Sequence, residues 1–428
     1  MKFDVIILGG GLTGLYVGYN LSKKGKKIAI IEKSNQLGGL LGSFKTRGDP
    51  LEKYYHHVFK GDKNFLELIK ELGIDERFHW TQSTLGFYSK GKIYDLSIPF
   101  KIISFKPLNF FEKIRFGMIG LKIKLTKNHK ELEKIPAKEW IIENGGLSIY
   151  HKLFYPLLKS KYGENLEKVS AAWFIERIKL RTKGGLRKEK LGYLKGGFEV
   201  LIKRMEEEIV KNGGKIIKGS IVRDLFINNG KLNGVIVGGK KLYSKIVVST
   251  IPLPRMVKFN NLPQDFREKL GSIKYQGAVC VVIGMDKKLT DFYWINIIDD
   301  SIIGAIIEHT NFQPVENYKD HIIYLASYPD FLSDVWKLTD DKVFEKYFSE
   351  LKRLFPEIDR KNVRWWKVFR DEDAGLVYDL NYSKRFVGNR TPIKGLIIGG
   401  MFNSYPERSI ESCLVEGKNI LNEINGVI

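Results

Sequence analysis

Cysteine and methionine are scarce in this sequence, and the scarcity limits the kind of protein it describes. Of 428 residues, two are cysteine, Cys280 and Cys413, and six are methionine. Two cysteines that lie far apart in apolar surroundings exclude a disulfide framework and favour a reducing compartment. The chain enters an apolar strand soon after Met1, so no secretory signal is predicted. We therefore expect a cytoplasmic protein.

Long hydrophobic runs, metal motifs and nucleic-acid modules are also missing. No segment reaches the ~18 uninterrupted apolar residues that a membrane span requires. No HExxH, CxxC or other metal spacing is present, so no metal is predicted. No nucleic-acid module is recognisable, so we expect no nucleic-acid partner despite the formal charge of +22. The charge instead suits an anionic or phosphorylated small-molecule substrate or an acidic membrane surface, and an ordinary solvated surface is the alternative.

The strongest pattern that is present lies in residues 2–32. The apolar run from Val5 to Leu8 is typical of a buried parallel strand. The motif GxGxxG follows it directly, then a helical segment, and then a second apolar strand that ends in Glu32. In such a unit the glycines allow a tight turn, a close approach to a pyrophosphate, and close packing of helix on strand.

This context predicts a dinucleotide site. The helix N-terminus would face the phosphates, and the carboxylate of Glu32 would accept hydrogen bonds from the ribose hydroxyls. A glycine-rich turn in an ordinary βαβ unit is the alternative, but it leaves the acid unexplained. The predicted contacts in this unit are Gly9, Gly11, Leu12, Thr13, Gly14, Glu32 and Lys33.

A second glycine pair, Gly38-Gly39, follows the acid. With it, the segment GGGLTGLYVGYNLSKKGKKIAIIEKSNQLGGLLGS resembles the FAD-binding head of the amine oxidase, protoporphyrinogen oxidase and phytoene desaturase superfamily. The resemblance implies FAD as the cofactor, with Gly38, Gly39 and Leu40 near its phosphates and ring. It also implies that Val222 contacts the adenine edge.

The C-terminal segment GLIIGGMFNSYPERSIESCLVEGKNILNEI resembles the closing strand, loop and helix of the same superfamily. The resemblance places this loop along the ribityl chain and the helix N-terminus at the pyrimidine end of the flavin. A helix dipole there would stabilise negative charge on the reduced ring. The matching positions are Gly400, Met401, Ser409 and Ile410.

The resemblance implies an α/β fold with a Rossmann-like FAD-binding domain of the two-dinucleotide-binding (GR2) type. An interleaved α+β substrate domain and a helical cap would complete it. A chain of this length usually divides into more than one core. We predict a discontinuous FAD-binding domain from residues 1–60, 196–258 and 391–428. Residues 61–195 and 259–390 would form the substrate-binding domain with its cap.

Three residues are candidates for catalysis. EKYYHHVF is similar in layout to a segment of UDP-galactopyranose mutases, which would put His57 near the flavin ring; a structural histidine is the alternative. His309 ends the apolar run IIGAIIEH, where polar side chains suggest contact with flavin or substrate; a hydrogen-bonded edge histidine is the alternative. Tyr378 matches a region where related amine oxidases carry an aromatic substrate wall.

We expect an FAD-dependent oxidoreductase in which hydride passes from an organic substrate to flavin N5. No second GxGxxG unit with strand, helix and acid is present for a nicotinamide. The alternative is a redox-neutral sugar-nucleotide mutase or isomerase, which would suit EKYYHHVF and the basic run at residues 177–195.

Residues 100–125 mix aromatic and aliphatic residues with spaced lysines. Phe110, Ile114, Gly117, Met118 and Leu121 would share one helical face. That face could contact an anionic membrane peripherally, or it could face the core with its lysines solvated. The oligomeric state is not predicted.

The alternation of apolar and polar residues over 78–96 predicts a hairpin that turns near Ser89, Lys90 and Gly91.

Overall fold

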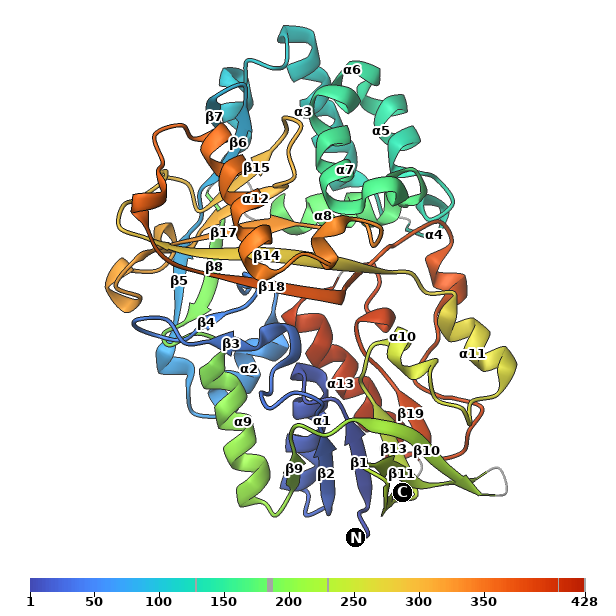
Figure 1. Ribbon diagram of the computed structural model, residues 1–428. Helices are drawn as coiled ribbons and strands as arrows, with labels where there is room; N and C mark the ends of the chain where they lie inside the picture. The colour runs from blue at the N-terminus through green and yellow to red at the C-terminus, as the bar shows by residue number, and fades with distance from the viewer. Residues whose placement is uncertain (128, 183–187, 229–230, 407, 427–428) are drawn as a thin grey trace.

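The computed structural model describes the chain except for residues 128, 183–187, 229–230, 407 and 427–428 (Figure 1). Part of the basic run discussed above, residues 183–187, therefore lies outside the described residues.

A five-stranded parallel sheet forms the lower part of the molecule in Figure 1. The residues of its central strands are buried without alternation, as both faces of a parallel sheet require. Helices α1 (Leu12–Lys23), α9 (Glu199–Lys211) and α13 (Ile410–Asn425) pack beside it, with α1 in contact with both others. The strand order is β19 (Leu396–Ile398), β13 (Ile246–Ser249), β1 (Val5–Leu8), β2 (Ile28–Ile31) and β9 (Lys215–Ile217).

A small antiparallel sheet lies between β9 and β13 in the sequence. It consists of β10 (Val222–Asn228), β11 (Lys231–Val237) and β12 (Lys240–Tyr243). β11 also contacts β13, so this sheet is attached to the parallel one.

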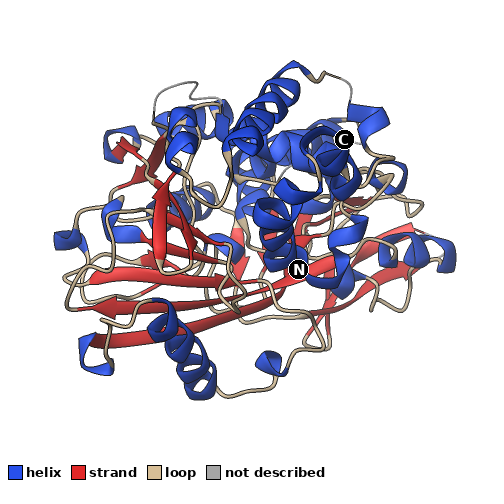
Figure 2. Ribbon diagram, turned by 90° about the horizontal axis from the view of Figure 1, so that it is seen from above, coloured by secondary structure: helices blue, strands red, loops and turns tan. Residues whose placement is uncertain are grey.

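A seven-stranded sheet forms a second layer above the first. All its pairings are antiparallel except that of β15 with β6. Helix α12 (Asp340–Leu354) packs on β14 and β18, and Figure 2 shows the long strands as one layer with helices on both sides. The strand order is β18 (Val363–Leu376), β14 (Tyr275–Met285), β17 (His321–Ser327), β16 (Ala305–Glu308), β15 (Trp294–Ile297), β6 (Leu85–Ser89) and β7 (Lys92–Asp95).

A group of helices covers the upper end of the molecule (Figure 1). Its longest member, α3, begins at a capping box: the Asn109 side chain accepts a hydrogen bond from the Glu112 N–H at 3.0 Å, and the Glu112 carboxylate accepts one from the Asn109 N–H at 2.7 Å. The helices are α3 (Phe110–Leu125), α4 (His129–Leu132), α5 (Ala137–Gly145), α6 (Leu147–Ile149), α7 (Tyr155–Tyr162) and α8 (Ala171–Thr182).

Short elements join these layers. They are β3 (Ser43–Phe44), β4 (Leu51–Glu52), α2 (Lys63–Glu71), β5 (Phe78–Gln82), β8 (Lys190–Leu194), α10 (Leu253–Met256) and α11 (Gln264–Gly271). β3 pairs with β4, and β5 pairs with β8. The strands of the parallel sheet come from three distant stretches of the chain, because the cap and the seven-stranded sheet are inserted between them. The first stretch holds β1 and β2, the second β9 and β13, and the third β19.

Candidate active site

One cavity of about 1810 Å³ runs between the parallel sheet, the seven-stranded sheet and the helical cap. Its wall contains fourteen of the fifteen residues predicted to contact the dinucleotide; the fifteenth, Gly14, lies behind it within α1. The residues brought together are Gly9, Gly11, Leu12, Thr13, Glu32, Lys33, Gly38, Gly39, Leu40, Val222, Gly400, Met401, Ser409 and Ile410.

Two glycines of the first turn, Gly9 and Gly14, occupy positions where a larger residue would not fit. Gly9 has a φ of 103°, in the region that favours glycine. A Cβ on Gly14 would lie 2.1 Å from the Gly9 carbonyl oxygen, so this glycine permits the close packing of α1 on β1. At Gly11, in contrast, a Cβ would meet no protein atom within 4 Å. The space in front of Gly11 is therefore open to the cavity.

The second glycine pair lies against the first turn. Gly38 and Gly39 have φ values of 106° and 58°. The Gly38 N–H donates to the Gly10 carbonyl at 2.8 Å, and a Cβ on Gly39 would lie 3.3 Å from the Gly11 Cα. The two glycine turns thus bring bare backbone together at one place on the cavity wall.

Glu32 ends β2 beside these turns. Its carboxylate accepts hydrogen bonds from the Gly10 N–H at 2.7 Å and from the Ser34 N–H at 2.8 Å. These bonds fix the orientation of the acid while it lines the cavity. A carboxylate has further acceptor capacity, so it can still receive hydrogen bonds from ribose hydroxyls.

The C-terminal helix closes this half of the cavity. Ser409 is the N-cap of α13 and forms a reciprocal cap with Ser412, in which the Ser409 hydroxyl accepts from the Ser412 N–H at 3.1 Å. The Thr13 hydroxyl donates to the Cys413 carbonyl at 3.2 Å, which joins the first turns of α1 and α13. Two helix N-termini therefore face one cavity, an arrangement that favours negative charge.

These features fit FAD. Open space at Gly11, an oriented acid at Glu32 and the uncapped N-terminus of α1 suit the diphosphate and the adenosine ribose. The N-terminus of α13 suits the pyrimidine edge of the flavin.

Residues 54–57 form another part of the cavity wall. The His57 Nδ1 lies 3.1 Å from the Tyr293 hydroxyl, and its ring packs edge-on against Phe59 and Trp294. The His56 Nδ1 bonds the Tyr54 carbonyl at 2.7 Å. Burial lowers the pKa of His56 to about 4, so this imidazole is neutral at physiological pH.

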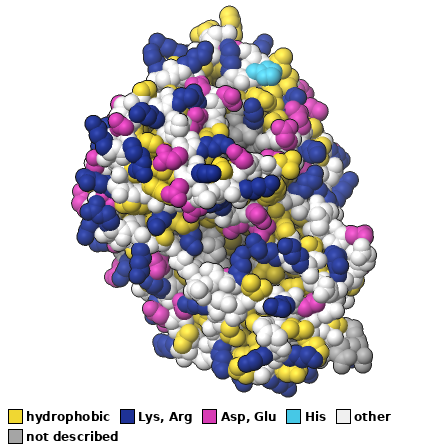
Figure 3. All heavy atoms as spheres, in the orientation of Figure 1, with side chains coloured by type: hydrophobic (Ala, Val, Ile, Leu, Met, Phe, Trp, Pro, Cys, Tyr) yellow, Lys and Arg dark blue, Asp and Glu magenta, His cyan; other side chains and the backbone are white. Residues whose placement is uncertain are grey.

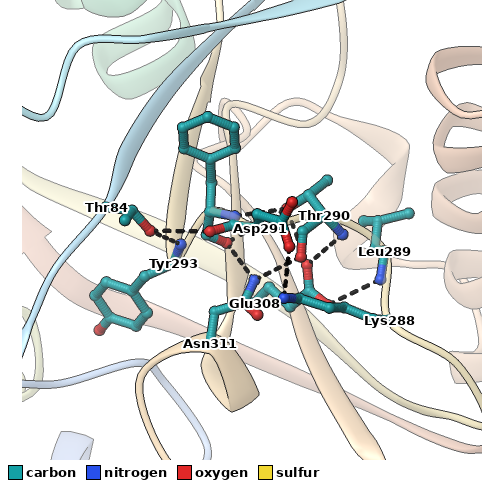
Figure 4. Close-up of polar contacts among 9 residues, drawn as sticks. Thr84, Lys288, Leu289, Thr290, Asp291, Tyr293, Glu308 and Asn311 are labelled. Atoms are coloured by element: carbon teal, nitrogen blue, oxygen red, sulfur yellow. Dashed lines mark hydrogen bonds and ion pairs between the residues drawn. The ribbon is translucent and has the colours of Figure 1, made fainter.

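A buried polar network holds Tyr293 in place (Figure 4). The Glu308 carboxylate accepts from the N–H groups of Leu289 and Thr290 at 2.8 and 2.7 Å, and from the Thr290 hydroxyl at 2.9 Å. The Tyr293 N–H donates to the Thr84 hydroxyl at 2.8 Å. Glu308 thus anchors the loop that brings the Tyr293 hydroxyl to His57. The sequence drew attention to Glu308 only through its neighbour His309, and nothing in the sequence singled out Tyr293.

His309 and Tyr378, the other two catalytic candidates, do not line the cavity. His309 is buried among aromatic rings, with its Nε2 2.8 Å from the Tyr318 hydroxyl, and burial lowers its pKa to about 3. The Tyr378 hydroxyl donates to the Ser404 carbonyl at 2.7 Å. Both residues make hydrogen bonds that stabilise loops and strands outside the cavity wall.

The remainder of the cavity is mainly apolar and extends to the cap. Residues from the cap helices α3, α7 and α8 and from the strands β14 to β17 border it. α3 reaches the cavity through both buried and exposed residues: Ile119 is buried, whereas Leu121 is 59% exposed. Because Leu121 borders the cavity and also faces solvent, the cavity approaches the surface at α3. The lining residues from α3 are Phe116, Gly117, Ile119, Gly120, Leu121, Ile123 and Lys124.

The outer face of α3 carries an apolar surface patch, which corrects the interpretation that this face packs into the core. Hydrophobic side chains gather at the top of the molecule among lysines and arginines (Figure 3). Within the described residues, no helix is both long and apolar enough to span a bilayer. The α3 patch, so named below, consists of Phe110, Phe111, Ile114, Met118, Leu121 and Leu125 on α3, with Phe100 and Ile103 from the helical turn Pro99–Ser104 before it, each at least 49% exposed.

The fold and the cavity define an FAD-binding oxidoreductase. Comparison with known proteins identifies its family: residues 12–424 match the flavin containing amine oxidoreductases, and the chain belongs to that family. The predicted fold class, the FAD cofactor and the assignment as an oxidoreductase are thereby confirmed.

Curated relatives include 15-cis-phytoene desaturases. The enzyme of an Oncidium hybrid cultivar is 23% identical over 458 residues, covering 97% of this chain and 76% of the relative. That of Arabidopsis thaliana is 24% identical over 452 residues, covering 97% and 78%.

Solved structures show the same fold. A protein of Exiguobacterium sp. 255-15, provisionally named protoporphyrinogen oxidase, has a TM-score of 0.79 at 17% identity and covers 99% of this chain and 98% of its own. Putrescine oxidase bound to putrescine has a TM-score of 0.75 at 14% identity, with coverage of 100% and 99%. Reduced UDP-galactopyranose mutase has a TM-score of 0.77 at 13% identity, with coverage of 100% and 96%.

Proposed function

We propose that the protein dehydrogenates an elongated, mainly apolar organic molecule that enters the cavity near α3. The observation that carries this proposal is the continuity of the cavity. The same cavity is lined by the glycine turns, by residues 54–57 and by apolar side chains of the cap. A cavity of about 1810 Å³ leaves room for a long substrate beside the cofactor. Bound FAD supplies the hydride acceptor at flavin N5.

The relatives support an apolar substrate. Several are named phytoene desaturases, a name that describes dehydrogenation of phytoene. Identity near 23% does not transfer phytoene itself to this chain, but the apolar lining favours a molecule of similar character.

His57 is the side chain that we propose to act on the substrate. It lines the cavity, and the Tyr293 hydroxyl fixes its ring through Nδ1. The imidazole so held would orient the substrate or move a proton. Tyr293 is a positioning residue in this scheme, and His309 and Tyr378 act through packing.

We further propose that the α3 patch contacts a membrane surface peripherally. Exposed aromatic and aliphatic side chains on a helix flanked by Lys113, Lys122 and Lys124 suit the interface of an anionic bilayer. Leu121 belongs to both the patch and the cavity wall, so a lipid-soluble substrate could pass from the membrane into the site.

The second candidate function is a redox-neutral mutase acting on a sugar nucleotide. His57 in the cavity wall and the cationic residues Lys161 and Arg177 nearby favour it, because a diphosphate would suit those charges.

The test is an anaerobic titration of the purified yellow holoprotein with polyunsaturated isoprenoid hydrocarbons and alcohols. Dehydrogenation predicts loss of the visible absorbance of oxidised flavin on mixing, and a His57→Ala variant that keeps FAD but reduces flavin at least about tenfold more slowly. Turnover of UDP-sugars that begins only after dithionite reduction, without net redox change, would instead establish the mutase.

A further inference from the structure

Three neutral polar side chains interrupt the apolar part of the cavity beside the seven-stranded sheet. Asn296 lies on β15, Tyr328 directly follows β17, and Tyr55 follows β4. They come from separate parts of the chain, but all three line the same cavity. These three residues are called the donor cluster below.

The orientation of the Asn296 amide is fixed by its neighbour on the same strand. Its Oδ1 accepts a hydrogen bond from the Trp294 Nε1 at 2.9 Å. An indole N–H can only donate, so the amide oxygen must face Trp294 and the NH2 group must face away from it. Among the described residues, no group accepts a hydrogen bond from this NH2 group. Asn296 therefore offers donors to the cavity that it lines.

The two tyrosines supply a further donor. Their hydroxyl oxygens lie 3.0 Å apart, so one hydroxyl donates to the other. The accepting hydroxyl keeps its own proton, which no other residue in the described part of the chain accepts. Burial raises the pKa of Tyr55 well above its ordinary value, so its hydroxyl stays protonated at physiological pH. The pair therefore presents one neutral O–H donor.

The Trp294 side chain connects the two parts of the donor cluster. Its indole N–H bonds Asn296, and its ring packs edge-on against Tyr55 with the ring centroids 4.9 Å apart. The same ring packs edge-on against His57, with the centroids 6.3 Å apart. The donors therefore lie in one region of the cavity, and that region includes His57.

We propose that the donor cluster binds a neutral carbonyl oxygen on a substrate that is otherwise apolar. This inference rests on the proposed function and specifies its substrate class. A carbonyl oxygen has two lone pairs and no proton, so it suits a cluster with donors in excess. A pure hydrocarbon would cover these donors without satisfying them, at a cost in free energy. A protonated amine would add donors and a charge that the neutral cluster does not balance.

The test compares 2-octanone with 2-methyl-1-octene, in which a methylene group replaces the carbonyl oxygen. Both compounds are volatile, so their affinity for the holoprotein is measured by partition between the solution and the gas above it. The affinity of the ketone relative to the alkene should fall at least about fivefold in Asn296→Leu, in the double variant Tyr55→Phe with Tyr328→Phe, or in both. The variant that responds identifies the donor. A variant that altered only packing would weaken both ligands alike.

Asn419→Leu and Tyr243→Phe are the matched controls, because both side chains are exposed and do not border the cavity. Both controls should keep the ratio of the unmodified holoprotein.

The carbonyl stretching band of bound 2-octanone gives a second readout, because hydrogen bonding lowers its frequency. In the unmodified holoprotein the band should lie below its position in hexane, and it should move toward that position in the variant that responds. If the variants fail to retain FAD, the band on the unmodified holoprotein decides the question.

A ratio that is unchanged in both variants, or a carbonyl band at its hexane position, would overturn the carbonyl site while leaving the apolar-substrate proposal standing. Tighter binding of 2-aminooctane than of 2-octanone would also overturn it, because an ammonium group needs acceptors. Failure of all these compounds to bind would contradict both proposals.

Discussion

Gly11 occupies a position where an added side chain should affect cofactor binding without affecting the fold. Its φ of −73° and ψ of 176° are open to any amino acid, and a Cβ there would enter empty cavity. We expect Gly11→Val to fold but to purify without FAD, because the side chain would occupy the space of the diphosphate. The ratio of flavin to protein absorbance measures this.

The matched control for Gly11→Val is Gly271→Val at the end of α11, where an added side chain also meets open space but no cavity. That variant should retain FAD in full. Normal flavin content in both variants would show that the pyrophosphate does not lie at Gly11.

The sequence could not decide which of the catalytic candidates faces the cavity. His57 and His309 both sit beside apolar runs, and the sequence offered no means to tell a cavity-facing imidazole from a buried one. The difference is decided by which element packs against each side chain. Tyr293 contacts His57, whereas Tyr318 and surrounding aromatic rings enclose His309.

Among the elements, α3 is the basis of the most direct prediction. A double substitution, Phe111→Glu with Met118→Glu, should leave folding and FAD content unchanged, because both side chains are more than 60% exposed. It should reduce sedimentation with vesicles of phosphatidylcholine and phosphatidylglycerol at least about fivefold, because two apolar contacts are replaced by charges that the anionic surface repels.

A second double variant, Leu332→Glu with Val210→Glu, is the control for the α3 double variant, since these exposed apolar side chains lie on other parts of the molecule. Vesicle binding that persists in the α3 double variant, or is lost equally in the control, would contradict membrane contact through this helix.

Individual strands and turns were predicted more accurately than the pairing between strands. The alternation over residues 78–96 predicted a hairpin turning near Lys90 and Gly91, and β6 and β7 do form that turn, with positive φ at both residues. The prediction was wrong for the first strand, because β5 pairs with β8 instead. Alternation reports that one face of a strand is buried, but it does not identify the strand's neighbour.

On the scale of the whole molecule, one cavity brings together segments that are far apart in the chain. Fourteen of the fifteen predicted FAD contacts lie on this one cavity, in residues 9–40, at Val222 and in residues 400–410. Removing FAD should therefore lower the urea midpoint of unfolding. Restoring it at a hundredfold excess over its dissociation constant should return about 2.7 kcal/mol of stability.

The Gly11→Val protein provides the reference for this measurement. Its midpoint should match that of the apoprotein and should not respond to added FAD. Identical midpoints for apoprotein and holoprotein would show that the cofactor does not couple these segments.

The sequence by itself determined the family, the FAD cofactor, and the glycine turns and helix cap that line part of the cavity. Those features depend on backbone conformation within short motifs, such as the turn at Gly9 and the cap at Ser409, and local sequence specifies them. The tertiary structure alone decided the rest. The outward face of α3 and the contact of Tyr293 with His57 depend on packing between distant elements, which residue type and spacing do not encode.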